Sequence, residues 1–190
     1  MLELISNIDR DLFLFLNGIH NEFFDVLMYW ISYKWTWVPL YLYLVYHLLR
    51  HNKKQAWLML GLMVVLIAMS DLVSVHLFKN VFGRYRPCHN ELIQDAVHIV
   101  KGHCGGIYSF VSSHSSTSFA IAIFASHFFK NKNVMYGLIL WATIVAYSRV
   151  YLGVHYPLDI VGGMLLGVVI ANFVIWLRSY LSRKLYKEVI

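Results

Sequence analysis

The sequence predicts an all-α fold, a polytopic bundle of transmembrane helices that forms a single domain over residues 1–190. Hydrophobic residues make up 59% of the chain and charged residues 14%, whereas soluble domains carry about 25% charged residues. Several apolar runs approach the roughly 20 residues that a helix needs to cross a bilayer. No linker rich in Pro, Gly or Ser divides the chain, and no internal repeat is visible. We therefore expect an integral membrane protein that is surrounded by lipid bilayer and binds no nucleic acid.

Five apolar runs are the candidate spans, and they cover residues 26–49, 56–78, 115–129, 134–147 and 158–177. The first is interrupted by Lys34 and Pro39, and its uninterrupted part, residues 35–49, is short. A proline inside a helix removes a backbone hydrogen bond and favours a break. We expect about five spans, with six as the alternative if the segment before residue 26 also crosses the membrane.

The segment before the first span is expected to form a helix that lies in the membrane interface. Leu12, Phe13, Phe15, Leu16 and Ile19 recur at near-helical spacing beside polar side chains, which is typical of an amphipathic interfacial helix. The charged residues around residues 2–8 do not fit the basic and then apolar pattern of a signal peptide. Membrane insertion is therefore expected to depend on the first span.

Basic residues predict the orientation of the bundle, because cytoplasmic loops are enriched in Lys and Arg. The side that holds the C-terminus carries nine of them: Arg50, Lys53, Lys54, Lys130, Lys132, Arg178, Arg183, Lys184 and Lys187. The other side carries seven, three of which belong to the polar segments described next. The C-terminus is therefore expected in the cytoplasm and the polar segments at the outer face.

Three short polar segments interrupt the apolar sequence, each at the same end of a predicted helix. Ionisable groups at membrane depth cost about 2.5 to 3.5 kcal/mol each on insertion scales, so they indicate function. Three of these groups are cations, which together suit a dianionic phosphate as ligand. The members are Lys79 and Arg86; Ser112, Ser113 and His114; and Ser148, Arg149, His155 and Asp159.

The third segment carries the most informative arrangement. His155 precedes Asp159 by four residues, so the carboxylate can hold the imidazole in one tautomer and leave the other ring nitrogen free to attack. Arg149 lies a few residues upstream, which suggests that the target of the attack is an anion.

The three segments resemble the signature motifs of the type 2 phosphatidic acid phosphatase family of membrane lipid phosphatases. Residues 79–87 match the first motif in full, and residues 148–159 match the third. The middle motif, residues 111–114, reads Val, Ser, Ser, His where the family has Pro, Ser, Gly, His. The serine and the histidine are kept, whereas a turn-forming Pro and Gly are lost.

The resemblance implies a metal-independent lipid phosphatase that uses no cofactor. It makes His155 the nucleophile that forms a phosphohistidine, Asp159 the residue that orients it, and His114 the general acid and then the base. The implied substrates are lipid phosphates: undecaprenyl diphosphate, phosphatidylglycerol phosphate, phosphatidate or phosphorylated lipid A. The small chain favours a bacterial cytoplasmic membrane, with the site at the periplasmic or outer face. The candidate phosphate-binding residues are Lys79, Arg86, Arg149, Ser112, Ser113 and Ser148.

Other functions are compatible with the same residues. A lipid phosphotransferase on this scaffold would pass the phosphoryl group to an alcohol, and a non-catalytic transporter would line a pore with the charges. The ionisable residues cluster at one membrane face instead of continuing across, which argues against a pore. The motifs are also shared with vanadium haloperoxidases, but those are soluble, and a scaffold with an inactive site is the remaining alternative.

Two cysteines, Cys88 and Cys104, fall in the loop between the second and third spans. An extracytoplasmic location allows a disulfide to persist, and we expect one between them. Free thiols are an alternative, as is a zinc site that would add histidines from His89, His98 and His103.

Four further ionisable residues are interpreted structurally. Lys34 and Arg84 are taken as interfacial anchors whose charged ends reach the membrane surface. Asp71 and His76 lie within the second span and must face protein or water, either as hydrogen-bonding partners inside the bundle or in support of the first polar segment.

Small residues in the last span predict close helix packing. Gly163 and Gly167 are separated by three residues, a pattern that lets two helices approach closely. We expect this contact within the chain instead of between two copies.

Overall fold

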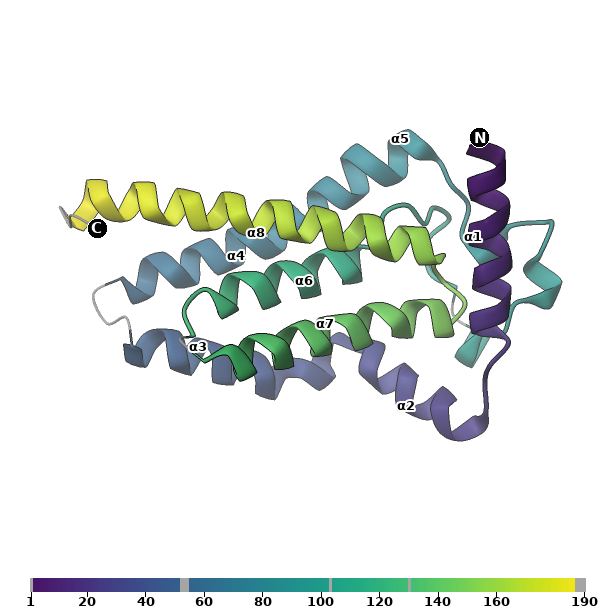
Figure 1. Cartoon of the computed structure of the whole chain (residues 1–190), viewed down its shortest axis with the longest axis horizontal. Coiled ribbons are helices and arrows are strands. Elements are labelled where there is room, and N and C mark those ends of the chain that lie inside the picture. The colour runs from purple at the N-terminus through teal and green to yellow at the C-terminus, as the bar shows by residue number, and fades with distance from the viewer. Residues whose placement is uncertain (1, 52–54, 103, 130, 187–190) are drawn as a thin grey trace.

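The structure is a computed structural model that describes residues 2–51, 55–102, 104–129 and 131–186. Figure 1 shows α3, α4, α6, α7 and α8 running along the long axis of the molecule, with α1 lying across one end. Within the described residues the only β pairing is one isolated bridge between Tyr85 and Tyr108. His103, Lys53, Lys54, Lys130 and Lys187, which entered the predictions above, lie outside the described residues. The main helices are α1 (Leu2–Asn17), α2 (Glu22–Ser32), α3 (Val38–His51), α4 (Ala56–Val73), α6 (Ser113–Ser126), α7 (Lys132–Tyr151) and α8 (Pro157–Tyr186).

In the part of the chain that the structure describes, three helices are long and apolar enough to cross a membrane, namely Ala56–Phe82, Lys132–Tyr151 and Pro157–Leu185. They correspond to the second, fourth and fifth predicted spans, each extended by a few residues. The first of the three is α4 continued by a π-helical turn, Ser74–Lys79, and by the short helix α5, Asn80–Phe82. The all-α helical membrane bundle that the composition predicted is therefore confirmed.

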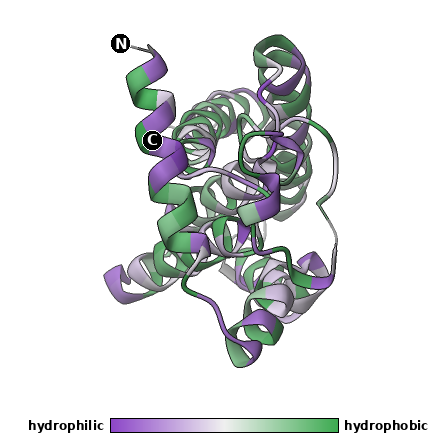
Figure 2. Ribbon diagram, turned by 90° about the vertical axis from the view of Figure 1, so that its right-hand side faces the viewer, coloured by the Kyte–Doolittle hydropathy of each residue, from purple (hydrophilic) through white to green (hydrophobic). Residues whose placement is uncertain are grey.

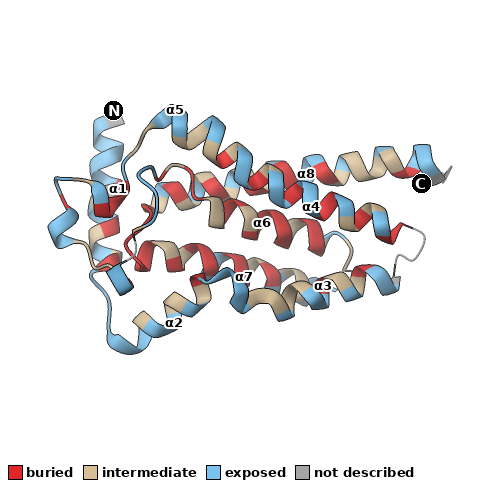
Figure 3. Cartoon of the chain, turned by 180° about the vertical axis from the view of Figure 1, so that it is seen from behind, coloured by how far each residue is buried: buried red, intermediate tan, exposed pale blue. Residues whose placement is uncertain are grey.

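The third predicted span is a short central helix. α6 contains 14 residues, about 21 Å at 1.5 Å per residue, and it packs most extensively against α8, with α7 and α4 on its other sides. Figure 3 shows most of α6 coloured as buried. Because protein surrounds α6, the thickness of the hydrocarbon layer does not fix its length.

The first predicted span is not one continuous helix, so that prediction was wrong. α2 ends at Ser32, and the next residue, Tyr33, has an extended conformation with ψ of 115°. A 3₁₀ turn, Lys34–Trp37, then leads into α3. Pro39 is the second residue of α3, where the missing amide hydrogen costs no helical hydrogen bond. The two residues that interrupted the apolar run in the sequence therefore lie where the helix breaks and restarts.

The helices α6 and α8 approach closely along a stripe of glycines. A Cβ on Gly163 would lie 2.5 Å from the carbonyl oxygen of Ser112, and one on Gly167 would lie closer still to that of Ser116. No side chain fits at either position without moving α6. The glycine pattern is therefore used within the chain, as predicted, and it fixes α6 against the start of α8.

The helix α1 has two different faces. Its buried side carries Asp9, Phe13 and Asn17, which are 3%, 0% and 1% exposed. Ile8 and Phe15 are among the apolar residues exposed on the remaining surface, and Figure 2 shows hydrophobic and hydrophilic stretches alternating along this helix. The placement of α1 across the end of the bundle matches the interfacial orientation that the sequence predicts.

The connections with most basic residues lie at the opposite end of the bundle from α1. Figure 1 shows the end of α3, the connection from α6 to α7 and the C-terminal end of α8 together at that end. Among the described basic residues there are Arg50, Lys132, Arg178, Arg183 and Lys184. All three polar segments lie at the other end, beside α1.

Candidate active site

The first polar segment is positioned by a change of helix geometry after α4. The last turns widen into the π-helical turn Ser74–Lys79, a feature that often marks functional sites. The helix ends at Gly83, whose φ of 57° lies in the left-handed region that glycine adopts without steric cost. The chain therefore breaks between Lys79 and Arg86, and the two side chains do not share one helical face.

Arg86 is held in place by backbone on two sides. Its side chain is buried, and its Nη1 donates to the carbonyl oxygen of Val154 at 3.2 Å. Its guanidinium lies beside Gly105, 3.6 Å from where a Cβ on that residue would be. Burial lowers the pKa of Arg86, whereas the nearby carboxylate of Asp159 raises it. The carbonyl that it contacts immediately precedes His155, so the first and third polar segments meet here.

The second polar segment starts α6 and contacts the first. Ser112 is the N-cap of α6, and its side chain accepts a hydrogen bond from the amide of Ser115 at 3.4 Å. The hydroxyl of Ser113 accepts a hydrogen bond from Nζ of Lys79 at 3.0 Å, and it lies 2.5 Å from the hydroxyl of Ser74. Ser112 therefore caps the helix, while Ser113 fixes the position of the lysine.

The third polar segment folds around the start of α8. Nδ1 of His155 lies 3.3 Å from Oδ2 of Asp159, which also accepts the amide hydrogen of Tyr156 at 2.9 Å. Pro157 is the first residue of the helix, a position that suits proline because no helical hydrogen bond is lost there. The carboxylate thus reaches back over the first turn to both the histidine and the helix start.

Arg149 and His114 complete the group. Nη1 of Arg149 donates to the hydroxyl of Ser32, a contact with α2 that the sequence did not suggest. His114 is half-buried at the start of α6 and interacts electrostatically with His155, Arg149, Lys79 and Arg86. The structure therefore brings the two imidazoles and the three cations into one site.

The electrostatic surroundings of His155 favour its neutral form. Its side chain is almost completely buried, and burial is the main reason why its pKa lies well below 6.5. The charges of Arg86, Arg149 and Lys79 lower this pKa further, because each repels an added proton. The imidazole therefore carries a free lone pair at neutral pH, as a nucleophile requires.

Two buried N–H groups at the site have no protein acceptor. Among the described residues, Nε of Arg86 and Nε of Arg149 are buried without a hydrogen-bond partner. A buried donor of this kind is costly unless something satisfies it. A tetrahedral oxyanion beside these guanidinium groups would do so and would match their geometry.

Two cavities meet beside His114. One, of about 470 Å³, is lined by Arg149 and by side chains of α2; the other, of about 450 Å³, extends between α3, α4, α6 and α7. Ser32, Lys34 and His114 line both. Lys34, interpreted as an interfacial anchor, is exposed and lines both cavities. The second cavity is largely aromatic on one side, through Trp37, Tyr41 and Trp141.

The two ionisable residues inside the second span differ in position. Asp71 lines the second cavity together with Ser113 and His114, so it faces the site. His76 is exposed on the outer surface of the π-helical turn. Asp71 is exposed and lines a cavity beside the site, which agrees with the expectation that it faces protein or water, whereas for the exposed His76 that expectation stays a prediction.

Arg84 was also interpreted as an interfacial anchor, and the structure contradicts this. Its Nη1 lies 3.0 Å from Oδ1 of Asp159 and its Nη2 lies 2.6 Å from Oδ2 of Asp9. The guanidinium is also 3.9 Å from the centroid of the Tyr156 ring. The partner carboxylates are 75 residues away on either side, so no local pattern could have indicated them.

Two serines differ from the expectation. The hydroxyl of Ser148, predicted to bind phosphate, donates to the carbonyl oxygen of Val145 at 2.7 Å, so its hydrogen is used within α7. Ser109, which no motif indicated, is fully buried and hydrogen-bonds Asp159 and the backbone beside Arg84. Its position depends on the loop conformation, which the sequence does not reveal.

Cys88 and Cys104 form a disulfide across 16 residues. The bridge removes the two thiolates that the alternative zinc site would need as ligands. His89 lies beside the bridge, with one of its ring nitrogens and the two sulfur atoms within 4.8 Å of one another. Since Arg86 precedes Cys88 by two residues and Gly105 follows Cys104, the bridge closes the loop that holds Arg86.

Comparison with known proteins gives the same picture. The family model described as the PAP2 superfamily matches residues 55–183. The chain is 36% identical over 176 residues to the lipid A 4'-phosphatase of Porphyromonas gingivalis, covering 91% of this chain and 74% of that protein. It is 37% identical over 187 residues to the lipid A 4'-phosphatase of Bacteroides thetaiotaomicron, covering 97% and 81%.

A solved structure shares the fold. The crystal structure of a transmembrane PAP2 type phosphatidylglycerolphosphate phosphatase from Bacillus subtilis aligns with a TM-score of 0.72 at 23% identity, covering 95% of this chain and 89% of that one. This likeness concerns the fold alone, and it extends over the whole bundle. With the family match over most of the described bundle, it follows that the chain is an integral membrane protein of the PAP2 superfamily.

Proposed function

We propose that the chain is a metal-independent lipid phosphatase in which His155 attacks the phosphorus and His114 protonates the departing oxygen. The observation that carries the proposal is the convergence of two imidazoles and three cations at one end of the bundle, with His155 oriented by Asp159 at 3.3 Å. The relatives are named phosphatases of lipids, which supports the same reaction.

In the first step, a ring nitrogen of His155 forms a bond to phosphorus while the bond from phosphorus to the lipid oxygen breaks. Burial, and then the charge of Arg149, hold the pKa of His114 well below 6.5 in the free protein, and the negative charge of a phosphate bound beside it raises that pKa. In the complex the protonated His114 gives its proton to that oxygen, so the lipid leaves as an alcohol, or as a lipid monophosphate when the substrate is a diphosphate. Because Nδ1 of His155 faces Asp159, Nε2 is the attacking nitrogen. The carboxylate stabilises the positive charge that develops on the ring.

In the second step, water hydrolyses the phosphohistidine. His114, now neutral, takes a proton from the water as its oxygen bonds to phosphorus, and the bond to His155 breaks to release inorganic phosphate. Lys79, Arg86 and Arg149 offset the charge on the phosphoryl oxygens in both steps, as preorganised cations do in phosphoryl transfer.

The substrate is a lipid whose phosphate is terminal, since every part of the leaving group must lie on the His114 side. The two cavities that meet at His114 offer room there for a polar head group and for an apolar chain. The two lipid A 4'-phosphatases make phosphorylated lipid A the first substrate to test. Undecaprenyl diphosphate, phosphatidylglycerol phosphate and phosphatidate complete the set.

The site is assigned to the periplasmic or outer face of a bacterial cytoplasmic membrane. The described basic residues gather at the opposite end of the bundle, which is expected to be cytoplasmic. The disulfide beside the site fits an oxidising compartment.

The test is the release of inorganic phosphate from each lipid by purified protein in the presence of EDTA. His155→Ala and His114→Ala are expected to lower kcat by at least about 10³-fold. The matched control is His127→Ala, which removes an exposed histidine from the opposite end of α6. Wild-type turnover in either active-site variant would refute its assigned role. Dephosphorylation of the lipid only when an alcohol acceptor is added, with the phosphoryl group on the alcohol and no free phosphate, would indicate a phosphotransferase. Anion flux in liposomes that survives His155→Ala would indicate a transporter.

A further inference from the structure

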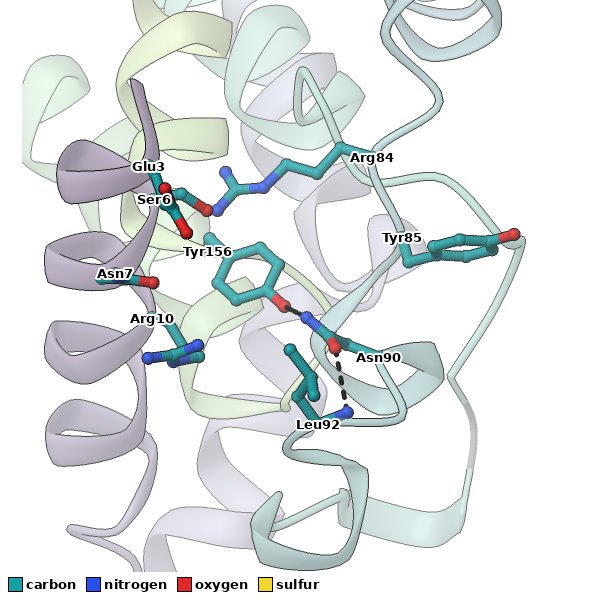
Figure 4. Close-up of a pocket in the computed structure, with 9 residues that line it drawn as sticks. All are labelled: Glu3, Ser6, Asn7, Arg10, Arg84, Tyr85, Asn90, Leu92 and Tyr156. Carbon is teal, nitrogen blue, oxygen red and sulfur yellow. Dashed lines mark hydrogen bonds between the residues drawn. The ribbon is translucent and has the colours of Figure 1, made fainter. Parts of the chain in front are cut away.

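Arg84 joins two carboxylates that belong to distant parts of the chain. Nη1 contacts Oδ1 of Asp159 at 3.0 Å, and Nη2 contacts Oδ2 of Asp9 at 2.6 Å. Figure 4 shows the Arg84 guanidinium reaching across the ring of Tyr156 toward α1. One guanidinium with two parallel donors is suited to hold two carboxylates in fixed positions.

Both oxygens of Asp159 are thereby fixed. Oδ2 accepts the amide hydrogen of Tyr156 at 2.9 Å and faces Nδ1 of His155, while Oδ1 is held by Arg84. The side chain is 0% exposed, so water does not compete for these bonds. A carboxylate that is anchored at one oxygen orients the group bound to its other oxygen.

Asp9 extends the chain of contacts to α1. Its Oδ1 accepts the amide hydrogen of Leu158 at 2.9 Å, and its Oδ2 binds Arg84. Asp9 is 3% exposed, and Phe13 on the same side of α1 packs edge-on against Tyr156 with ring centroids 5.3 Å apart. α1 is therefore fastened to the first turn of α8, the turn that carries Asp159.

We propose that Arg84 is a positioning residue and that Asp9 acts through it, so that the seating of α1 on the bundle sets the orientation of His155. The chain of contacts is Asp9, Arg84, Asp159, His155. The inference rests on the proposed roles of His155 and Asp159. It makes α1, which lies outside the family match to residues 55–183, part of the catalytic apparatus.

The first measurement separates kcat from KM in variants of Arg84. Arg84→Gln removes both contacts and is expected to lower kcat by about 10- to 100-fold, the range seen when a supporting contact of a catalytic residue is lost. KM is expected to stay within about threefold, because Lys79, Arg86 and Arg149 still bind the phosphate. Arg84→Lys keeps the positive charge but loses the pair of guanidinium donors that contacts both carboxylates. Its kcat is therefore expected to lie between those of Arg84→Gln and the wild type.

The second measurement tests whether Asp9 acts through Arg84. Asp9→Asn is expected to lower kcat by about tenfold, whereas Asp11→Asn, a neighbouring carboxylate that is 70% exposed and pairs with Arg10, should leave kcat unchanged. In the double variant that combines Asp9→Asn with Arg84→Gln, kcat is expected to be the same as in Arg84→Gln alone. Such non-additivity identifies two residues that act as one unit.

His155→Ala is measured in parallel. If it has no activity while Arg84→Gln and Asp9→Asn keep wild-type kcat, the inference is wrong and the proposed function stands. If His155→Ala retains turnover, the proposed function and the inference about Arg84 are both wrong. A purely structural role for Arg84 predicts a lower melting temperature with kcat per folded molecule unchanged, and this result would also overturn the inference. Equal melting temperatures with a lower kcat would support it.

Discussion

Nδ1 of His155 lies 3.3 Å from Oδ2 of Asp159, and the two side chains are 2% and 0% exposed. Asp159 is the third residue of α8, and the same Oδ2 accepts the amide hydrogen of Tyr156, the residue before the helix. A carboxylate at the third helical position that reaches back to the preceding amide is a known way to start a helix. One side chain therefore fixes both the start of α8 and the orientation of the proposed nucleophile.

Asp159→Asn is expected to lower kcat by about 10²- to 10⁴-fold with a much smaller change in KM. The amide side chain can still accept from the Tyr156 amide, but it no longer stabilises positive charge on His155, and it can hold the ring in the wrong tautomer. The measurement is the initial rate of phosphate release over a range of lipid concentrations. Asp95→Asn, in the exposed loop, is the control, and equal kcat values in the two variants would contradict the role of Asp159.

The pH dependence of kcat/KM is expected to reflect the low pKa of His155. Burial, and then the charges of Arg86, Arg149 and Lys79, hold this pKa well below 6.5, so the nucleophile stays unprotonated as the pH falls through 6.5. The acid limb of the profile is therefore expected below the pH at which an ordinary histidine titrates. Arg86→Gln removes one of the repelling charges and should move this limb to higher pH, and a shift to lower pH would contradict the assignment.

The same low pKa affects stability with a defined sign. Below pH 6.5 the unfolded chain binds a proton at His155 that the folded chain does not bind, so the free energy of unfolding falls as the pH is lowered. The contribution is fully present above about pH 6.5, the pKa in the unfolded chain. His155→Ala is therefore expected to lose less thermal stability than the wild type between pH 7 and pH 5.

Reduction of the disulfide is expected to weaken phosphate binding and lower stability. The bridge joins Cys88 to Cys104, and the Arg86 guanidinium lies where a side chain on Gly105 would meet it, 3.6 Å from the position of a Cβ, so both ends of the bridge border the arginine. A bridge over about 15 residues contributes roughly 3 kcal/mol to the free energy of unfolding. We expect KM to rise by about three- to tenfold. The Cys88→Ser, Cys104→Ser double variant should show the same KM with and without reductant, and a KM insensitive to reductant in the wild type would contradict the link to Arg86.

The motifs in the sequence predicted which residues gather at one end of the bundle, but not the contacts that support them. Lys79, Arg86, His114, Arg149 and His155 come together because their spacing places each at the same end of a helix, and helix ends follow from the length of apolar runs. The supporting contacts depend on tertiary structure. A charged residue such as Arg84 has the same appearance in the sequence whether its partner is solvent, lipid or a carboxylate on a distant helix.

For the helices of the bundle, too, some features were predicted from the sequence and others were not. The three long spans were predicted because an apolar stretch of sufficient length has few other stable arrangements in lipid. The break at Tyr33 and the short α6 were not, since both depend on neighbours. α6 has protein on its sides, so the length rule for a helix surrounded by lipid does not apply to it.

Gly167→Ala is expected to destabilise the protein by about 1 to 3 kcal/mol, the usual cost of overpacking. The added Cβ would overlap the carbonyl oxygen of Ser116 and lie 3.0 Å from the amide nitrogen of Ala120, so α6 would have to move away from α8. That movement would also strain the hydrogen bond from the Ser112 amide to the Asp159 carbonyl at 3.0 Å, and kcat should fall with the melting temperature. Gly61→Ala is the matched control, because a Cβ there meets nothing within 4 Å and alanine favours the helix by about 1 kcal/mol. A methyl group cannot fit between two closely packed backbones without lowering the free energy of unfolding. If Gly167→Ala melts at the same temperature as Gly61→Ala and the wild type, the close approach of α6 and α8 at Gly167 does not hold the two helices together.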